Sequence, residues 1–309
     1  MQIERVSLAD YAKLPLKHTH VFNTPAFSAL NEHKADDLHC LVFHDGGKCR
    51  YGITLGERGG RLLSPFSAPF GGFSCAKTHH LEQLDAAAEA LALYARDSGM
   101  PLRVALPPLF YDQQLLSETV NVLSRHGRIG YVDLNYHFPI RRFADYEKNI
   151  ARNARKNLRH AAECGLEFVV VWRDDREGLC QAYDVIRRNR EEHGYPLRMS
   201  LDDVEKTVKL IDADFFLLRH DGKNVAAAQV FHVAEGIAQV IYWGDLRAYS
   251  ALRPMNMLAY RLFEHYSRQG LQVLDIGPST ENGVPNYGLC DFKTGIGCVA
   301  SPKFVFEIV

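Results

Sequence analysis

The clearest pattern of apolar and polar positions lies in the last quarter of the chain. Apolar residues recur at helical spacing over residues 254–268, while charged and polar residues fill the opposite side. Pro254 suits the first position of a helix, where its missing N–H costs nothing, and Gly270 suits the left-handed residue just past the end. Apolar strand patterns precede and follow this helix, at 239–243 and 273–276. The pattern therefore predicts strand, polar loop, helix and strand, with the loop beside the N–H groups of the helix start.

The same order of elements is expected in the first half of the chain. There, two strands, a short third strand, a helix that Gly99 ends and a last strand follow one another over residues 38–106. The turn sequence His-Asp-Gly at 44–46 has its counterpart at 220–222. We interpret this correspondence as a duplication with an offset of about 170–176 residues.

A basic segment lies between the two halves. Residues 145–164 are predicted to form one helix that Asp145 caps and Gly165 ends. Because no acid is interleaved among the cations on one side of this helix, their charges repel one another and favour a polyanionic partner. Such a partner is tRNA, or the diphosphate of a nucleotide- or lipid-linked sugar; a solvated face is the alternative. The stripe consists of Lys148, Arg152, Arg155, Lys156 and Arg159.

Composition limits the class of protein. Lys and Arg number 36 against 37 Asp and Glu, so no overall field attracts nucleic acid, and DNA is not expected as a partner. Seven cysteines without a Cys-x-x-Cys motif indicate reduced thiols and a cytoplasmic location. No apolar run approaches the length of a membrane span. The histidine pairs at 18/20 and 79/80 have no matching carboxylate or thiolate pattern, so no metal site is expected.

Four stretches resemble the FemABX-like aminoacyltransferases, which are tandem members of the GNAT acyltransferase superfamily. They are Asn23-Thr-Pro-Ala-Phe27, the basic helix at 152–161, Asn189-Arg-Glu-Glu-His-Gly194, and Asp275-Ile-Gly277 with Phe292-Lys-Thr-Gly-Ile-Gly297. The resemblance implies an α+β (mixed α/β) fold of two tandem GNAT-like domains, at 1–140 and 141–309, with a cleft between them. Each domain is expected to be a mixed, mostly antiparallel sheet flanked by helices.

The resemblance also implies a function. An acyl or aminoacyl group would pass from an acyl-CoA or a charged tRNA to an amine acceptor, such as a cell-wall (peptidoglycan) precursor peptide. An acetyl-CoA-dependent N-acetyltransferase and a non-catalytic module that binds an anionic ligand are the alternatives. No Gly-x-Ser-x-Gly, P-loop or His-Glu-x-x-His motif points to another chemistry.

One departure from the GNAT pattern concerns the loop before the helix at 254–268. GNAT enzymes hold the CoA pyrophosphate there with a glycine-rich loop, because glycine lets backbone N–H groups approach phosphate closely. This chain has Ser250 and Leu252 at the glycine places, and FemABX-like proteins are similarly degenerate. The substrate-binding residues expected around this helix start are Tyr242, Arg247, Tyr249, Ser250, Arg253 and Asn256.

Two residues near the end of the chain are the catalytic candidates. Asp275 lies at a strand end, where it could orient an amine or a lysine. Lys293 is expected in a glycine-bounded turn, where its ammonium could hold phosphate or carboxylate. A solvated or lysine-paired carboxylate and a surface lysine are the alternatives. Since alignment of two substrates supplies much of the rate of amine acylation, the chemistry does not require a stronger motif.

Overall fold

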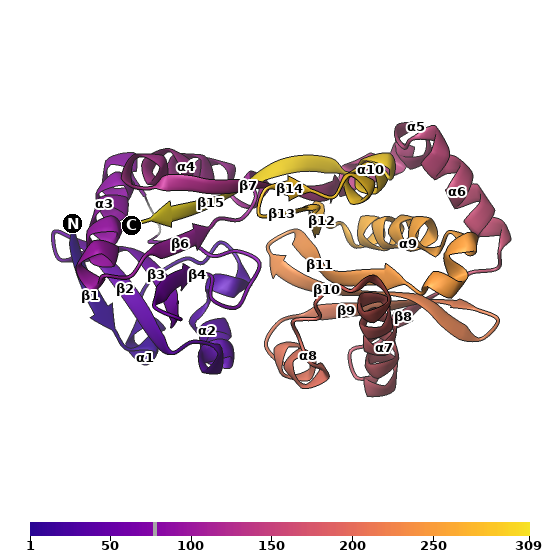
Figure 1. Ribbon diagram of the computed structural model, residues 1–309, viewed down its shortest axis with the longest axis horizontal. Helices are drawn as coiled ribbons and strands as arrows, with labels where there is room; N and C mark the ends of the chain where they lie inside the picture. The colour runs from indigo at the N-terminus through magenta and orange to yellow at the C-terminus, as the bar shows by residue number, and fades with distance from the viewer. Residues whose placement is uncertain (77–78) are drawn as a thin grey trace. The chain divides into compact units, whose positions relative to one another are not determined.

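The computed structural model describes residues 1–76 and 79–309 and contains two compact units. The first unit comprises residues 1–134, 280–284 and 301–309, and the second comprises 135–279 and 285–300. Each unit is a mixed, mostly antiparallel sheet flanked by helices (Figure 1), which confirms the expected fold class. The last segment of the chain therefore belongs to the unit that its first 134 residues form.

The sheet of the first unit is built around one β-hairpin, whose two strands span residues 37–45 and 48–58. Leu41 and Phe43 of β2 face α3 and α4, while Cys40 and Val42 face α1, so strand alternation buries both faces. The strand order is β1(Gln2–Val6), β2(Asp37–Asp45), β3(Lys48–Arg58), β4(Arg61–Ser64), β6(Leu102–Ala105) and β15(Val299–Ile308), and β5(Ser74–Cys75) also pairs with β3. The helices are α1(Leu8–Tyr11), α2(Pro25–Asn31), α3(Leu81–Ser98) and α4(Gln113–His126), with 3₁₀ turns η1(Val21–Asn23), η2(Glu32–Lys34) and η3(Leu109–Tyr111).

The sheet of the second unit separates two apolar cores. Ala226 and Ala228 of β10 pack on the side of helix α9, and Ala227 packs on the side of α7 and α8. The strand order is β7(Arg128–Pro139), β12(Val273–Pro278), β11(Ile237–Asp245), β10(Lys223–Ala234), β9(Ala213–His220) and β8(Glu167–Val171). The helices are α5(Tyr146–Asn149), α6(Arg152–Glu163), α7(Arg176–His193), α8(Leu201–Thr207), α9(Pro254–Gln269) and α10(Tyr287–Gly295), with η4(Ile140–Asp145) and η5(Arg247–Leu252). The short strands β13(Thr280–Glu281) and β14(Val284–Pro285) form a separate pair.

The two units share one order of elements. In the first, β2, β3 and β4 are antiparallel neighbours, α3 follows, and β6 returns parallel to β4. In the second, β9, β10 and β11 are antiparallel neighbours, α9 follows, and β12 returns parallel to β11. The next strand in each unit comes from the other half of the chain, since β15 pairs with β6 and β7 pairs with β12. The duplication itself remains our interpretation, and the domain boundary at 140/141 remains a proposal.

Helix α9 follows the sequence prediction closely. Pro254 occupies its first turn, and Gly270 follows its last residue with a φ of 72°, the left-handed conformation that glycine adopts without strain. Eight of its residues are buried, which fixes the helix against the sheet. The start of α9 is thereby held beside the end of β11 and the loop between them.

The predicted helix at 145–164 is wrong in its boundaries. Ile150 and Ala151 are extended, with ψ values of 155° and 149°, so the segment divides into α5 and α6. Asp145 does not cap a helix by its side chain. The branched Ile150 packs in the core instead, and its burial stabilises the break.

Two further differences affect the site. Residues 291–295 belong to helix α10 rather than to a turn, because the side chain of Asn286 accepts a hydrogen bond from Leu289 N and starts that helix. Helix α4 and strand β7 occupy a region for which the sequence pattern predicted no element.

Candidate functional site

The parallel strands β11 and β12 pair over a short distance and then stop pairing. Their register joins residues 237–239 to residues 273–275, although both strands continue. Beyond Gln239, the β12 side of β11 has no ladder partner within the described part of the chain. A strand edge of this kind can hydrogen-bond an extended ligand through its backbone. We therefore take this split between β11 and β12 as the centre of the candidate site.

Asp275 lies at the base of the split and is fully buried. Its carboxylate accepts hydrogen bonds from Asn135 Nδ2 at 2.7 Å, Gln239 Nε2 at 3.0 Å and the backbone N–H of Gly277 at 2.9 Å. Gly277 has a φ of 73° and lies in a bulge of β12 against β7, between Asp275 and Pro278. The carboxylate thus connects three neighbouring strands and holds the bulge from one side.

Lys293 of α10 holds the same bulge from the other side. Its side chain is 2% exposed, and Nζ donates to the carbonyl oxygens of Ile276 at 2.8 Å, Gly277 at 2.8 Å and Pro278 at 3.0 Å. The ring centroid of Tyr136 lies 5.7 Å from Nζ. Burial lowers the pKa of Lys293 to about 8, although Cys298 and Asp275 oppose the shift. The three ammonium hydrogens are directed to backbone carbonyls, so the expectation that this group holds a phosphate or carboxylate must be revised.

A second bulge lies in β11 opposite Gln229 of β10. The register passes from Tyr242 to Val240, so Ile241 is an extra residue in the ladder. Gln229 is fully buried, and within the described part of the chain neither polar atom of its side chain has a hydrogen-bond partner; the same holds for Oε1 of Gln239. An unsatisfied buried amide costs about 1–3 kcal/mol. Of these two residues, Gln239 lies on β11, which borders the split, so its Oε1 is the atom that a ligand at the split could satisfy.

The loop before α9 is a 3₁₀ turn tied to helix α7. Arg247 donates from its backbone N–H to Glu192 Oε2 and from Nη2 to the Glu192 carbonyl, both at 2.8 Å. Arg253 follows the turn with a φ of 56°, a left-handed conformation that costs a non-glycine residue roughly 1–2 kcal/mol. Its cation also lies at the positive end of the α9 dipole. An anion bound here would offset the second cost.

The other residues expected around this loop are placed in three different ways. Ser250 is exposed, Tyr249 is half-buried against the apolar cores, and Asn256 is buried in the first turn of α9. Tyr242 points to the α7 side, where its hydroxyl accepts from Arg198 N and the guanidinium of Arg190 lies 5.0 Å from its ring centroid. Tyr242 therefore stabilises a half-buried arginine, whose pKa burial lowers.

Helix α6 connects the two parts of the site. At its start, Ala151 N donates to Gly295 O of α10 at 2.9 Å, and near its end, His160 Nε2 lies 3.1 Å from Ala251 O of the loop. Arg152 and Lys156 are exposed and form no ion pair among the described residues. Arg159 lies 3.8 Å from Glu147, and Arg155 Nη2 donates to Ile150 O.

The expected stripe of five cations is therefore shorter than the sequence indicated. Lys148 lies on α5 and pairs with Asp145 at 2.7 Å, so it does not continue the face of α6. Acids from the preceding turn lie beside the stripe, which the sequence spacing concealed. Arg152, Lys156 and Arg159, spaced i, i+4 and i+7, remain on one face of α6.

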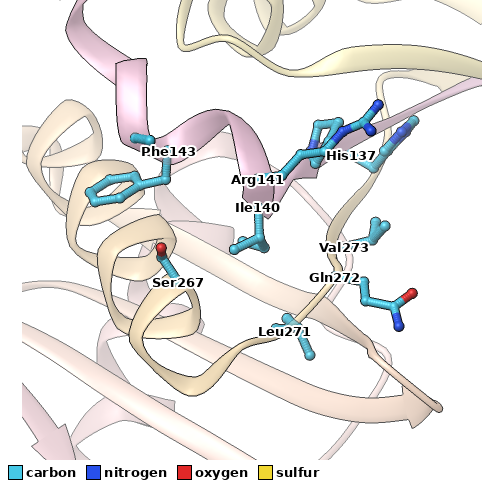
Figure 2. A pocket seen from close by; sticks show the side chains of 10 residues that line it. His137, Ile140, Arg141, Phe143, Ser267, Leu271, Gln272 and Val273 are labelled. Atoms are coloured by element: carbon cyan, nitrogen blue, oxygen red, sulfur yellow. The ribbon is translucent and has the colours of Figure 1, made fainter.

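Among the cavities that the described residues form, two that border the candidate site lie within the second unit. One of about 270 Å³ borders the loop before α9 and is lined by Tyr249, Ala251, His220 and Lys223, among others. The larger, of about 700 Å³, lies where η4 meets the start of β12 and the end of α9. Figure 2 shows its wall, which includes Arg141, Phe143, Ser267, Gln272 and His137. His137 also pairs through its backbone with Asp275, so this cavity and the split share a strand pair.

Several residues of the candidate site escaped sequence reasoning. Asn135, in a strand that the sequence pattern did not predict, donates to Asp275 at the base of the split. Gln239 also donates to Asp275, and Gln229 lies on the neighbouring strand β10. Gln229 and Gln239 are each a polar residue within an otherwise apolar strand pattern. That interruption was the available signal. Arg190, whose guanidinium contacts the ring of Tyr242, lies within the stretch 189–194 that the resemblance to FemABX-like proteins had singled out.

Comparison with known families bears on the second unit. Residues 148–294 match the family described as acetyltransferase (GNAT) domain, a segment that includes β9 to β12, α9 and Lys293. A search of curated proteins finds no match. Among the described residues, no helix has the length and apolar character needed to cross a bilayer.

Solved structures resemble the whole chain. FemX aligns with a TM-score of 0.66 at 12% identity, over 100% of this chain and 97% of that one. The C-terminal domain of a putative lysylphosphatidylglycerol synthetase from Agrobacterium fabrum aligns with a TM-score of 0.62 at 14% identity, over 98% and 93%. A tandem GNAT protein from the clavulanic acid biosynthesis pathway aligns with a TM-score of 0.52 at 11% identity, over 99% and 97%. At these identities the likeness concerns the fold, and the fold is of the GNAT type.

Proposed function

We propose that this protein is an N-acyltransferase of the FemABX-like type, which transfers an acyl or aminoacyl group to an amine acceptor. The observation that carries the proposal is the split between β11 and β12, whose base is held by Asp275 and whose bulge is held by Lys293. Strand edges on a rigid sheet can align an extended donor for attack, and alignment supplies much of the rate of such a reaction. The matched GNAT segment contains both strands and both residues.

Charged tRNA is the donor that we favour. The turn at 247–252 contains no glycine, so side chains stand where backbone N–H groups would otherwise approach a pyrophosphate. Beside it, α6 presents Arg152 and Lys156 without acidic partners among the described residues, a surface suited to a polyanionic backbone. Because the sequence resembles the FemABX-like aminoacyltransferases, we propose a peptidoglycan precursor peptide as the amine acceptor.

An acyl-CoA donor is the second candidate. The 270 Å³ cavity beside the loop includes His220 and Lys223, which could hold a phosphate group of CoA. The acceptor in this case is again an amine, and the reaction class is unchanged. The two donors differ in the charge and length of the surface that they need.

The reaction requires few protein groups. The acceptor nitrogen attacks the donor carbonyl carbon and forms a C–N bond, and the C–O bond to tRNA or the C–S bond to CoA then breaks. The leaving oxygen or sulfur takes the electron pair, and the proton lost by the amine passes to it or to solvent. Asp275 and Lys293 are proposed to act as positioning residues, because their polar atoms are engaged by the bulge that borders the donor.

The test measures transfer and donor binding together. Purified protein is incubated with an aminoacyl-tRNA pool or acetyl-CoA and an amine-bearing precursor peptide, and the product is detected by mass spectrometry. We expect a product with aminoacyl-tRNA and a rise in Tm with that donor. Transfer from acetyl-CoA alone would select the second candidate. Tight binding of either donor without any transfer would contradict both.

Variants of α6 test the tRNA surface. The double variant R152Q/K156Q should weaken tRNA binding and reduce the slope of log K against log salt by about 1.5 from a wild-type value of about −3. The matched control R188Q/K209Q removes two exposed cations of the same unit that lie outside α6 and should leave the slope unchanged. Equal effects of the two double variants would show that net charge alone is responsible.

A further inference from the structure

A group of three possible metal ligands lies in the first unit, within the part of the chain that the structure describes. Asp37 and His39 are two residues apart on β2, and Glu57 of β3 is the register partner of Asp37. The three side chains therefore project from the same face of one rigid hairpin pair. Their ligand atoms all lie within 4.8 Å of one another.

The separations suit a small divalent cation. His39 Nε2 lies 3.4 Å from Glu57 Oε2 and 3.7 Å from Asp37 Oδ2. Two ligands at about 2.1 Å from a tetrahedral zinc ion are about 3.4 Å apart, so one ion fits between these atoms without large movement. Direct hydrogen bonds to Nε2, in contrast, would require shorter contacts.

The imidazole of His39 supplies independent evidence. The side chain is 4% exposed, and Nε2 has no hydrogen-bond partner among the described residues although it lies near two carboxylates. Nδ1 lies 2.8 Å from the hydroxyl of Tyr94 on α3. If Nδ1 carries the proton and its N–H donates a hydrogen bond to this hydroxyl, Nε2 is unprotonated. The lone pair of Nε2 then faces two carboxylates, which is unfavourable unless a cation lies between them. Metal-bound histidines are oriented by such a contact on the other nitrogen.

We propose that Asp37, His39 and Glu57 bind one divalent first-row metal ion, with zinc as the best fit to one imidazole and two carboxylates. Tyr94 orients the imidazole, and water completes the coordination from the exposed side of Asp37, whose side chain is 52% exposed. Arg5 competes with the ion, because its Nη2 lies 2.6 Å from Asp37 Oδ2 and 3.0 Å from the Leu38 carbonyl. The site lies wholly in the first unit and takes no part in the transfer reaction proposed above.

Cobalt absorption and zinc calorimetry test the proposal on the full chain. Wild-type protein should bind one Co²⁺ with visible absorption bands typical of four-coordinate cobalt and without the near-ultraviolet band of a cobalt thiolate. Zinc should displace it at the same stoichiometry. H39Q and E57Q should each lower zinc affinity by more than about 100-fold, and Y94F by about 10-fold. E57Q changes a half-buried position rather than a buried one and keeps the test valid should H39Q fold poorly.

Two further variants, R5Q and H44Q, distinguish a metal site from a simple ion pair. R5Q should tighten zinc binding about fivefold, because it removes a neighbouring positive charge. H44Q is the matched control, since His44 Nε2 also lies near one carboxylate, that of Glu4 at 3.2 Å, but lacks a second; zinc affinity should not change. A thiolate band, zinc affinity equal in H39Q, E57Q and wild type, or weaker binding in R5Q would overturn the proposal.

Discussion

At the scale of single residues, Lys293 combines nearly complete burial with a bulge of three carbonyl groups. A surface position was the natural alternative for a lysine near glycines, but the side chain is buried and its ammonium donates to backbone carbonyls. The three carbonyls of residues 276–278 converge because Gly277 adopts a positive φ and Asp275 fixes its N–H. The geometry of the bulge therefore depends on the charge of one side chain.

Replacing Lys293 by methionine tests this dependence. The methionine keeps the length and apolar body of the side chain but leaves three carbonyls without a donor, so the bulge should shift. A displacement of about 1 Å can lower turnover about 100-fold. We expect K293M to remain folded by circular dichroism and to lose transfer activity by that factor. K303M, which alters another buried lysine, is the control; equal loss in both variants would contradict the assignment.

The same variant has a predicted pH signature. Because the pKa of Lys293 is about 8 in the folded protein and ordinarily 10.5, the unfolded chain holds more protons between these values. The stability of wild type relative to K293M should therefore rise with pH across this window. Urea unfolding at pH 7.5, 8.5 and 9.5 measures it, and a flat or falling difference would show that burial does not perturb the ammonium.

We expect that replacing Arg253 by glycine raises the stability of the protein and lowers its affinity for the donor. Glycine at this position would relieve the left-handed strain, so R253G should stabilise the protein by about 1 kcal/mol. The same change removes a cation from the start of α9, and donor affinity should fall severalfold. Thermal unfolding and donor binding are measured on the same samples. A variant that is more stable and binds donor normally would exclude Arg253 from the site.

At the scale of elements, a hydrogen-bonded triad of one buried and two half-buried residues fastens α9 to β9. Asp214 Oδ2 accepts hydrogen bonds from Tyr266 of α9 and His232 of β10, each at 2.7 Å. Burial raises the pKa of Asp214, but these two hydrogen bonds outweigh burial and leave its pKa below the ordinary value. The hydrogen bond to Asp214 raises the pKa of His232. The helix that begins at the candidate site is thus anchored near its other end.

The triad should act within a defined pH range. Since the folded pKa of His232 is raised, its stabilisation is complete below about 6.5 and is lost as pH rises through the folded value. We expect H232Q to cost about 1 kcal/mol at pH 6, where the imidazole is charged, and less at pH 8.5. Chemical unfolding of both proteins at the two pH values measures the difference. An equal cost at both pH values would show that His232 stabilises the protein only through packing.

Elements with strong local signals could be predicted from the sequence. Helix α9 and its terminal Gly270 appear where periodicity and the terminating glycine placed them. The break at Ile150 could not be predicted, because an isoleucine in a helical pattern signals burial without revealing that it interrupts the helix. Nor could the ligand group of Asp37, His39 and Glu57, since register between two strands brings it together.

The candidate site was predictable only in part. Asp275 and Lys293 do lie together, but their contacts with Gly277 depend on a bulge that no local pattern encodes. Whether they and the loop residues act in transfer remains a prediction. The buried amides Gln229 and Gln239 could have been noticed as polar interruptions of apolar strands.

At the scale of the whole molecule, each unit is completed by a strand from the other half of the chain. Strand β15 pairs with β6 through residues 305–308 and 102–105, and it contributes the buried Phe306 and Ile308 to the first core. Strand β7 pairs with β12 and contributes Phe138 to the second. A division at residue 140 therefore separates strands from the sheets that they complete.

Removing residues 301–309 should consequently destabilise the first unit, far away in sequence. The deletion uncovers one edge of β6 and exposes two large apolar side chains, each of which contributes about 1.5–3 kcal/mol when buried. Hydrogen exchange should show loss of protection in β6 and α4, with β9 and β10 protected as before. Loss confined to residues near 299 would contradict this view of the fold.

Because each sheet needs a strand from the other half of the chain, the sheet of the first unit cannot be completed early in synthesis. The polypeptide that emerges first must wait, with the edge of β6 uncovered, until more than 190 residues have followed. During that interval the uncovered strand edge of β6 can pair with other chains and promote aggregation. For the same reason, cutting the chain once does not yield two halves that each contain a complete sheet.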